Sequence, residues 1–367
     1  MKEGEGDFET LLKEATGETV EEAAQWIRKG ELVAFPTETV YGLGANGLDG
    51  SACKKIFEAK GRPQDNPLIL HIADRSQLDE IVEEVPASLE PLMEKLWPGP
   101  MTLIFKKSQR VPREVTAGGE TVGVRMPSHP IARALIRKAA CPIAAPSANR
   151  SGKPSPTNAR DVLQDMAGRI PFILNGGDCQ IGIESTVIDA TVEPAEILRP
   201  GYYTREVLDP FLRQVRYDRS ILRDGEIPKS PGQKYRHYAP DARVTIYLGS
   251  PEGVFRTMQV KTQKNLEQGK RTGLLLFEEE GMRIEKFGDQ DYLYNAGGEV
   301  IPAHRVCFCG KRGNLERMAS LMFTALRQFD REGMDEIIAE GVEAEGFGVS
   351  IMNRLRKSAS GRVFYVD

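Results

Sequence analysis

The hydrophobic periodicity of this chain fades between about Arg213 and Pro240, and this gap constrains the possible fold more than any other feature. On either side of it, short apolar runs typical of strands alternate with segments of helical spacing. The gap itself is rich in charged and turn-forming residues, with seven Lys or Arg against three Asp or Glu. The sequence therefore predicts two α/β domains, 1–212 and 241–367, joined by a basic linker over 213–240.

Length and charge agree with this division and exclude several classes of protein. A chain of 367 residues can bury two sizeable cores. Its 49 Lys and Arg against 53 Asp and Glu give a net charge of −4, which argues against a protein that coats nucleic acid through a broad positive field. No apolar run approaches the length of a membrane helix, and the acidic start lacks an apolar signal segment. We therefore expect a cytoplasmic protein that does not enter a membrane.

The first domain is expected to contain a mixed open sheet with flanking helices. Its apolar runs predict strands, but strands and helices do not alternate strictly enough for an all-parallel arrangement. The predicted strands span 32–35, 68–72, 101–105, 122–126, 142–145, 172–174 and 186–188, and the predicted helices span 52–60 and 131–139.

The second domain shows a more regular alternation of strands and helices. This pattern favours a smaller, Rossmann-like parallel sheet. Strands are predicted at 244–248, 274–277, 305–309, 336–339 and 363–366, and helices through the 250s and 260s, at 314–329 and at 349–356.

The five cysteines do not have the pattern of a disulfide framework. Cys307 and Cys309 alternate within an apolar run, as two side chains on one face of a strand would. Because no second cysteine pair or nearby histidine completes a zinc set, we interpret them as strand residues and predict no metal site.

A glycine motif, Gly42-Leu-Gly-Ala-Asn-Gly47, matches the dinucleotide-binding pattern G-x-G-x-x-G. In dinucleotide-binding folds this motif turns directly off a strand into a helix. Here six residues separate the end of the predicted strand at Phe35 from the first glycine. The sequence context therefore argues against a dinucleotide site.

Positively charged residues lie near the ends of predicted helices and strands. Lys60 and Arg62 flank a glycine at the end of a predicted helix, and Arg125 lies in an otherwise apolar strand. Lys60 and Arg62 could merely complement the helix dipole, and Arg125 could form a structural salt bridge. The alternative is that these cations bind a carboxylate or a phosphate.

Neutral hydrogen-bonding groups are concentrated near the same strand ends. They lie in the segments 36–44 and 146–152, and Ser185 and Arg199 add a further hydroxyl and a further cation. The second segment alone could be a turn, and a strand histidine such as His71 is more often structural than catalytic. Without a Cys-His or Ser-His-Asp order, the set favours binding of a polyanion beside a small polar substrate, with no covalent nucleophile.

Taken in order, these motifs resemble a known family. The ordered motifs are similar to the motifs of the threonylcarbamoyl-AMP synthases, which are built on a YrdC-like domain. They are P-T-E-T-V-Y-G-L-G, K-G-R-P, N-P-L with a histidine, R-M-P, S-A-N, S-T-V and R-P-G. The linker end K-Y-R-H-Y-A-P and the second α/β domain resemble the two-domain form of that family. The resemblance spans nearly the whole chain, and Gln233 departs from it where methionine is expected.

The resemblance implies a nucleotidyltransferase that joins L-threonine, bicarbonate or CO₂, and ATP into threonylcarbamoyl-AMP and releases pyrophosphate. Mg²⁺ would accompany the ATP rather than occupy a dedicated metal site. The product would pass to a separate tRNA threonylcarbamoyl transferase complex that modifies adenosine 37, so direct tRNA binding would not be required.

The resemblance also implies roles for individual residues. The threonine pocket would use Thr39, His71, Arg125, the backbone near Ala145, and Ser185, with Arg125 as the partner of the amino-acid carboxylate. The ATP site would use Lys60, Arg62, Asn66, Thr121, Ser147, Asn149, Ser155, Arg199 and, from the linker acting as a lid, Tyr235. Of these, Lys60, Arg62, Ser147 and Asn149 would act in catalysis.

Two other functions are compatible with parts of the sequence. An RNA- or ribosome-associated protein could use a basic concave surface around Lys60, Arg62, Arg125 and Arg199, although the net negative charge weakens this reading. A carbamoyl transferase of the hydrogenase-maturation type would carry zinc-finger cysteines and an acylphosphatase-like segment, which this chain lacks.

Overall fold

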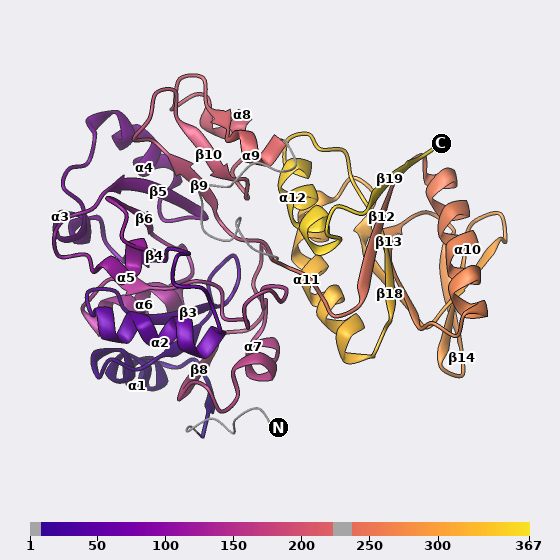
Figure 1. The fold of residues 1–367 in the computed structure, drawn as a ribbon, viewed down its shortest axis with the longest axis horizontal. Helices are drawn as coiled ribbons and strands as arrows, with labels where there is room; N and C mark the ends of the chain where they lie inside the picture. Colours follow the sequence, from indigo (N-terminus) through magenta and orange to yellow (C-terminus); the bar gives the residue numbers. More distant parts are fainter. Residues whose placement is uncertain (1–8, 223–236) are drawn as a thin grey trace. The chain divides into compact units, whose positions relative to one another are not determined.

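The computed structural model describes residues 9–222 and 237–367 (Figure 1). Within these residues the chain divides into two compact units. The first unit comprises 9–151 and 155–222, and the second comprises 152–154 and 237–367. Each unit is an α/β structure with its own sheet.

An eleven-stranded mixed sheet forms the framework of the first unit. Parallel pairs such as β4 with β6 stand beside antiparallel pairs such as β5 with β6, which confirms the predicted mixed sheet. In spatial order the strands are β1 (Leu11–Glu14), β8 (Phe172–Asn175), β2 (Val33–Phe35), β3 (Gly42–Asn46), β7 (Ile143–Ala144), β4 (Ile69–His71), β6 (Thr121–Arg125), β5 (Met101–Lys106), β9 (Thr186–Asp189), β10 (Glu196–Arg199) and β11 (Arg216–Tyr217).

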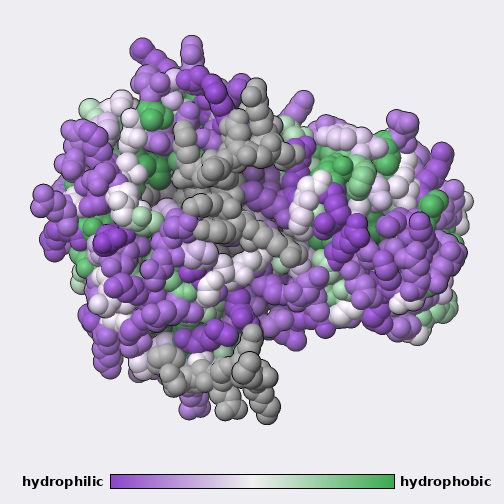
Figure 2. Space-filling view, in the orientation of Figure 1, coloured by the Kyte–Doolittle hydropathy of each residue, from purple (hydrophilic) through white to green (hydrophobic). Residues whose placement is uncertain are grey.

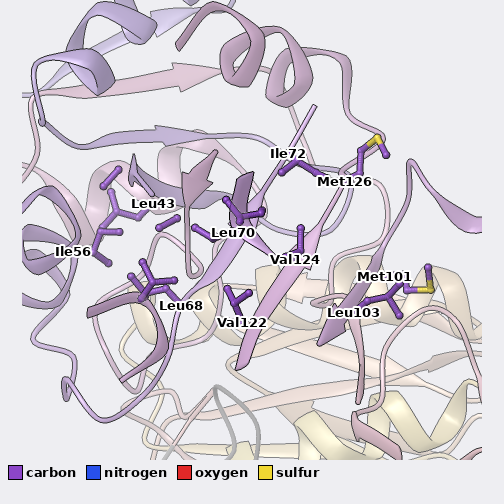
Figure 3. Packing of buried hydrophobic residues seen from close by; sticks show 14 of the residues in the cluster. Leu43, Ile56, Leu68, Leu70, Ile72, Met101, Leu103, Val122, Val124 and Met126 are labelled. Carbon is purple, nitrogen blue, oxygen red and sulfur yellow. The ribbon is translucent and has the colours of Figure 1, made fainter. Parts of the chain in front are cut away.

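Two apolar clusters bury the side chains of this sheet. Successive strand residues point to opposite faces, so Val33 and Phe35 enter one cluster and Ala34 enters the other. The first cluster packs against α1 (Gly17–Arg28) and α6 (Pro130–Ala139), and the second against α2 (Gly50–Lys60). Figure 3 shows part of the second cluster around Leu43, Ile56 and Leu70.

Shorter helices complete the first unit. They are α3 (Leu78–Ile81), α4 (Glu90–Leu96), α5 (Arg113–Thr116), α7 (Ala159–Met166), α8 (Arg205–Leu208), α9 (Arg219–Leu222) and the single 3₁₀ turns Arg75–Gln77 and Ala87–Leu89.

The ends of α2 explain where two of the predicted cations lie. Asp49 caps the first turn by accepting hydrogen bonds from the amides of Ser51 and Ala52. Gly61 ends the helix in the left-handed conformation, at φ 60°, which glycine adopts without steric cost. Lys60 therefore occupies the last helical position, and Arg62 lies just beyond it.

The second unit contains a parallel sheet of five strands, which confirms the predicted parallel arrangement. Their order is β17 (Arg305–Lys311), β13 (Thr272–Glu278), β18 (Glu336–Glu340), β12 (Arg243–Gly249) and β19 (Val363–Val366), with helices α10 (Pro251–Glu267), α11 (Leu315–Arg331) and α12 (Gly348–Ser358). Cys307 and Cys309 lie on β17, as the alternating pattern predicted, and all five cysteines are free thiols.

Some elements were not predicted from the sequence. A three-stranded antiparallel sheet, formed by β14 (Arg283–Phe287), β15 (Gln290–Tyr294) and β16 (Val300–Ala303), belongs to the second unit, and β1 and α1 precede the first predicted strand. The predicted linker begins too early, because β11 pairs with β10 inside the first unit. Much of the remaining predicted linker lies outside the described residues.

The glycine motif forms strand β3 rather than a phosphate-binding turn. In antiparallel pairing with β2, Gly44 lies opposite Val33 and Gly42 opposite Phe35. A Cβ atom on Gly44 would lie 2.7 Å from Ile143 Cγ2 and 2.8 Å from the Phe35 ring. Close packing under an aromatic ring, and not a dinucleotide, therefore explains this glycine.

Polar and charged residues predominate on the face shown in Figure 2, with apolar residues scattered among them. In the described part of the chain, no helix combines the length and the apolarity that crossing a membrane requires.

Replacing Gly44 with alanine is expected to destabilise the first unit by about 1–3 kcal/mol, because the added methyl group overpacks the space under Phe35. Gly17→Ala is the matched control, since Gly17 is exposed and a Cβ there meets nothing within 4 Å. Urea unfolding followed by tryptophan fluorescence measures the effect, because both tryptophans, Trp26 and Trp97, lie in the first unit. Equal stabilities of the two variants would contradict the packing argument.

Candidate active site

The carboxyl ends of strands β4 and β6 bring together two of the predicted site residues. The strands are parallel, and His71 and Arg125 are register partners at their last positions. Side chains at such strand ends commonly form ligand sites in α/β proteins. Both residues are buried, with exposed fractions of 5% for His71 and 4% for Arg125.

A small cavity of about 50 Å³ opens beside these two strand ends. All five residues predicted for the threonine pocket line it, together with Ser147 and Arg199 from the predicted ATP site. Its lining consists of Thr37, Thr39, Val40, Gly42, Ile69, His71, Arg125, Ala145, Pro146, Ser147, Glu184, Ser185 and Arg199.

A larger cavity, of about 270 Å³, adjoins the first through Ile69, which lines both. Thr121 of the predicted ATP site contributes to its wall. The wall also contains the apolar side chains of Ile104, Val187 and Leu198, beside the polar Thr116 and Asp189. Ile69, Val187 and Leu198 form a separate buried cluster, with Ile104 packed against it.

The guanidinium groups in the small cavity have different partners. Arg125 Nη2 lies 2.8 Å from Oε1 of Glu38, and both side chains are at most 6% exposed. Arg199 donates to the carbonyl of Ser185 at 3.1 Å and to the hydroxyl of Ser185 at 3.0 Å. Ser185 Oγ is also 2.8 Å from Thr102 Oγ1. Each cation is thus neutralised or held by a neighbouring polar group.

His71 is neutral at ordinary pH. Burial, assisted by the charge of Arg125, lowers its pKa to about 3. Its Nδ1 lies 3.2 Å from the carbonyl oxygen of Ile69, which accepts a hydrogen bond when this nitrogen carries the proton. The ring also packs edge-on against Phe35, with centroids 6.2 Å apart. The imidazole can therefore serve as a fixed, uncharged hydrogen-bonding group.

The ammonium group of Lys60 holds the segment that contains Ser147 and Asn149. It donates to the carbonyl of Ser147 at 2.5 Å and to the carbonyl of Asn149. Ser147 in turn donates to the side-chain oxygen of Asn149 at 2.5 Å. Lys60 and Asn149 do not line either cavity, but both are bonded to Ser147, which does.

Three further residues of the predicted ATP site are arranged in the same indirect way. Arg62 donates to the carbonyl of Asn66 at 3.2 Å and to that of Pro67 at 3.1 Å, and Pro67 lines the larger cavity. Ser155 donates to the carboxylate of Glu184, which lines the smaller one. Tyr235 lies outside the described residues.

Sequence reasoning missed two buried carboxylates at the site. Glu38 pairs with Arg125, and Glu184 lines the small cavity. Both stand inside motifs that the sequence singled out, P-T-E-T and I-E-S-T-V, flanked by residues with small or apolar side chains. A carboxylate among such neighbours is the sequence feature that could have identified both residues as candidates for the site. Among the described residues, no group of three His, Cys, Asp or Glu side chains is arranged to hold a metal ion.

Comparison with known families assigns both parts of the chain. Residues 25–201 match the Sua5/YciO/YrdC family model described as "Telomere recombination", and residues 203–360 match "Threonylcarbamoyl-AMP synthase, C-terminal domain". A threonylcarbamoyl-AMP synthase of Pyrococcus abyssi is 46% identical over 94% of this chain and 95% of its own length. The chain belongs to the threonylcarbamoyl-AMP synthase family.

Other relatives agree with this assignment. A threonylcarbamoyl-AMP synthase of Bacillus subtilis is 47% identical, over 94% of each chain. A crystal structure described as P. abyssi Sua5 complexed with L-threonine has 44% identity and a TM-score of 0.86, covering 98% of this chain and 99% of that one. This two-domain synthase therefore makes threonylcarbamoyl-AMP for the t6A modification of tRNA.

Acid is expected to destabilise the first unit through His71. Because its folded pKa of about 3 lies below the ordinary value of 6.5, only the unfolded chain binds this proton in between. The contribution of the neutral His71 to the free energy of unfolding is complete above pH 6.5. It is lost as the pH falls, by up to about 1.4 kcal/mol per pH unit. Urea unfolding monitored by tryptophan fluorescence should show that the free energy of unfolding depends less steeply on pH in His71→Asn than in the wild-type protein. An unchanged slope would mean that His71 is protonated in the folded protein.

Proposed function

We propose that the two adjoining cavities hold the two organic substrates of the synthase, L-threonine in the small one and ATP across the larger one. The observation that carries this proposal is Arg125, a buried guanidinium at the wall of a cavity that is also lined by the hydroxyl groups of Thr39 and Ser185 and by the imidazole of His71. A guanidinium in such a place binds a carboxylate through paired hydrogen bonds.

The residues that line the small cavity suit the polar groups of L-threonine. Arg125 would bind its carboxylate, and the backbone near Ala145 would border its carbon skeleton. Thr39, Ser185 and the neutral His71 offer hydrogen-bonding groups for the remaining polar atoms. A crystal structure of a relative is described as complexed with L-threonine, which supports this amino acid as the ligand.

The larger cavity suits a nucleotide. Its apolar wall from Ile104, Val187 and Leu198 can cover the flat base, and Thr121 offers a hydroxyl beside it. The phosphates would then extend past Ile69 toward Ser147 and Arg199, with Lys60 bonded to Ser147 and Arg62 bonded to Pro67 at the wall of the larger cavity. In this arrangement the phosphates would lie next to the threonine nitrogen.

The reaction then requires one bond to form and one to break at the α-phosphorus. The threonine nitrogen, once carboxylated by bicarbonate or CO₂, presents a carbamate oxygen that attacks this phosphorus, and pyrophosphate leaves. Negative charge that builds on the phosphates would be offset by Lys60, Arg62 and Arg199. Ser147 and Asn149, held by Lys60, would donate hydrogen bonds to the same oxygens.

Mg²⁺ would enter with ATP and offset part of the phosphate charge. Magnesium in nucleotide sites is usually bound by one or two carboxylates together with phosphate oxygens. Glu184 is the carboxylate that lines the small cavity, so the residues present fit such an ion. Tyr235 and the linker around it remain the predicted lid, which would keep water from the carbamate.

We further propose that the enzyme reaches tRNA through its product, which a separate transferase complex in the cytoplasm would use. The alternative, an exposed basic surface for RNA, finds little support. Lys60, Arg125 and Arg199 are only 3%, 4% and 6% exposed, and each makes contacts with neighbouring polar groups. Cations buried in this way are not available to a phosphate backbone.

Purified protein incubated with ATP, Mg²⁺ and bicarbonate should release pyrophosphate only when L-threonine is added. Pyrophosphate release and the formation of threonylcarbamoyl-AMP, followed by mass spectrometry, measure the two products. Pyrophosphate release that is absent, or that does not depend on threonine, would contradict the proposed function.

Replacing Arg62 with alanine should lower kcat by about 10²-fold, because one positioned charge that stabilises a transition state typically supplies a factor of this size. Arg110→Ala is the matched control, since the Arg110 side chain is 64% exposed and pairs with Glu80 away from both cavities. Steady-state kinetics at saturating threonine and ATP compare the two variants. If the Arg62 variant kept the wild-type kcat, Arg62 would have no role in stabilising the transition state.

A further inference from the structure

The ion pair between Glu38 and Arg125 has unusual geometry. The two side chains are 6% and 5% exposed, and their charged atoms approach to 2.8 Å. The atoms are not aligned as a hydrogen bond, however. Both oxygens of Glu38, and Nε and Nη2 of Arg125, lack a hydrogen-bond partner within the described residues. Buried charged atoms with unused hydrogen-bonding capacity indicate that a ligand completes this pair.

The Glu38 carboxylate lies beside the threonine cavity without lining it, 2.8 Å from the Arg125 guanidinium that does line it. Thr37 and Thr39, on either side of it in the chain, both line that cavity, as does Arg125. The backbone of this segment is fixed, because the amides of Ile181 and Gly182 donate to the carbonyls of Glu38 and Thr39 at 2.9 and 3.0 Å. Contact with a ligand therefore needs movement of the Glu38 side chain only.

Charge balance limits what can displace Glu38 from Arg125. A ligand with a carboxylate alone would take the guanidinium and leave Glu38 buried without a counter-ion, which is strongly unfavourable. A zwitterion brings a positive charge as well. Its carboxylate can bind Arg125 while its ammonium group binds Glu38, so all four charges remain paired.

We propose that Glu38 binds the ammonium group of L-threonine and, together with Arg125, makes the site specific for a zwitterionic amino acid. This inference rests on the proposed threonine site. The other cavity carboxylate, Glu184, already accepts a hydrogen bond from Ser155, so Glu38 is the carboxylate with capacity to spare. The charge of Glu38 also acts on His129, Cys179 and Tyr203, where it favours the protonated form of each group. In their neutral forms, these three groups offer no positive charge that would compete with the ligand for Glu38.

Calorimetric titration with two ligands tests this role. The ligands are L-threonine and 2,3-dihydroxybutanoate of matching configuration, which carries a hydroxyl in place of the ammonium group. Wild-type protein should bind L-threonine about 10- to 100-fold more tightly than this analogue, the effect of one charged hydrogen bond. Glu38→Gln should bind L-threonine correspondingly more weakly and the analogue as tightly as wild type or more so, because Arg125 is then free for a lone carboxylate.

The change in preference separates recognition from a structural role. A merely structural Glu38 would weaken both ligands alike, and an unchanged preference in Glu38→Gln would overturn the inference. Asp178→Asn, which removes an exposed carboxylate in the same unit, should preserve the wild-type preference. If Glu38→Gln does not fold, Glu38→Asp keeps the charge on a shorter side chain and should bind L-threonine more weakly while still preferring it to the analogue. Loss of that preference, or wild-type affinity for L-threonine, would count against the inference.

A second substitution distinguishes failure of this inference from failure of the threonine site itself. Arg125→Met should abolish binding of L-threonine. If it does not, the proposed threonine site is wrong. If Arg125 is required and Glu38→Gln keeps the wild-type preference, the threonine site stands and only the role of Glu38 is rejected.

Discussion

The need to neutralise a buried guanidinium organises the active site of this synthase. Arg125 ends a strand in which Val122 and Val124 enter the core, and it is itself buried, so its charge lies where water cannot compensate it. Glu38 supplies the opposite charge from the loop between β2 and β3. That loop is in turn held by backbone hydrogen bonds from Ile181 and Gly182. A single buried charge thus ties three distant segments of the chain to one cavity.

A second buried cation serves the phosphate side in a comparable way. Lys60 completes helix α2 and donates to two carbonyls of the segment that contains Ser147 and Asn149. Its charge therefore lies close behind the groups expected to meet the nucleotide, while its hydrogen bonds fix their position. Preorganisation of this kind lets donors stabilise developing charge without rearranging during the reaction.

Much of the fold follows from local patterns in the sequence. Apolar runs identified the central strands, and the regular alternation after residue 241 identified the parallel sheet. Strand β3 escaped because its glycines resemble a turn, although close packing under Phe35 requires them. The strands β14 to β16 escaped because several of their side chains are exposed and carry little apolar signal. The residues predicted for the L-threonine pocket came from ordered motifs. Glu38, in contrast, could be assigned a partner only once the fold placed it beside Arg125.

A crystal structure of this protein with L-threonine and a non-hydrolysable ATP analogue would test the central claim most directly. The account predicts that the threonine carboxylate lies on Arg125 and that its nitrogen faces the α-phosphate. The base should lie against Ile104, Val187 and Leu198. Threonine bound away from Arg125, or a nucleotide outside both cavities, would contradict the account.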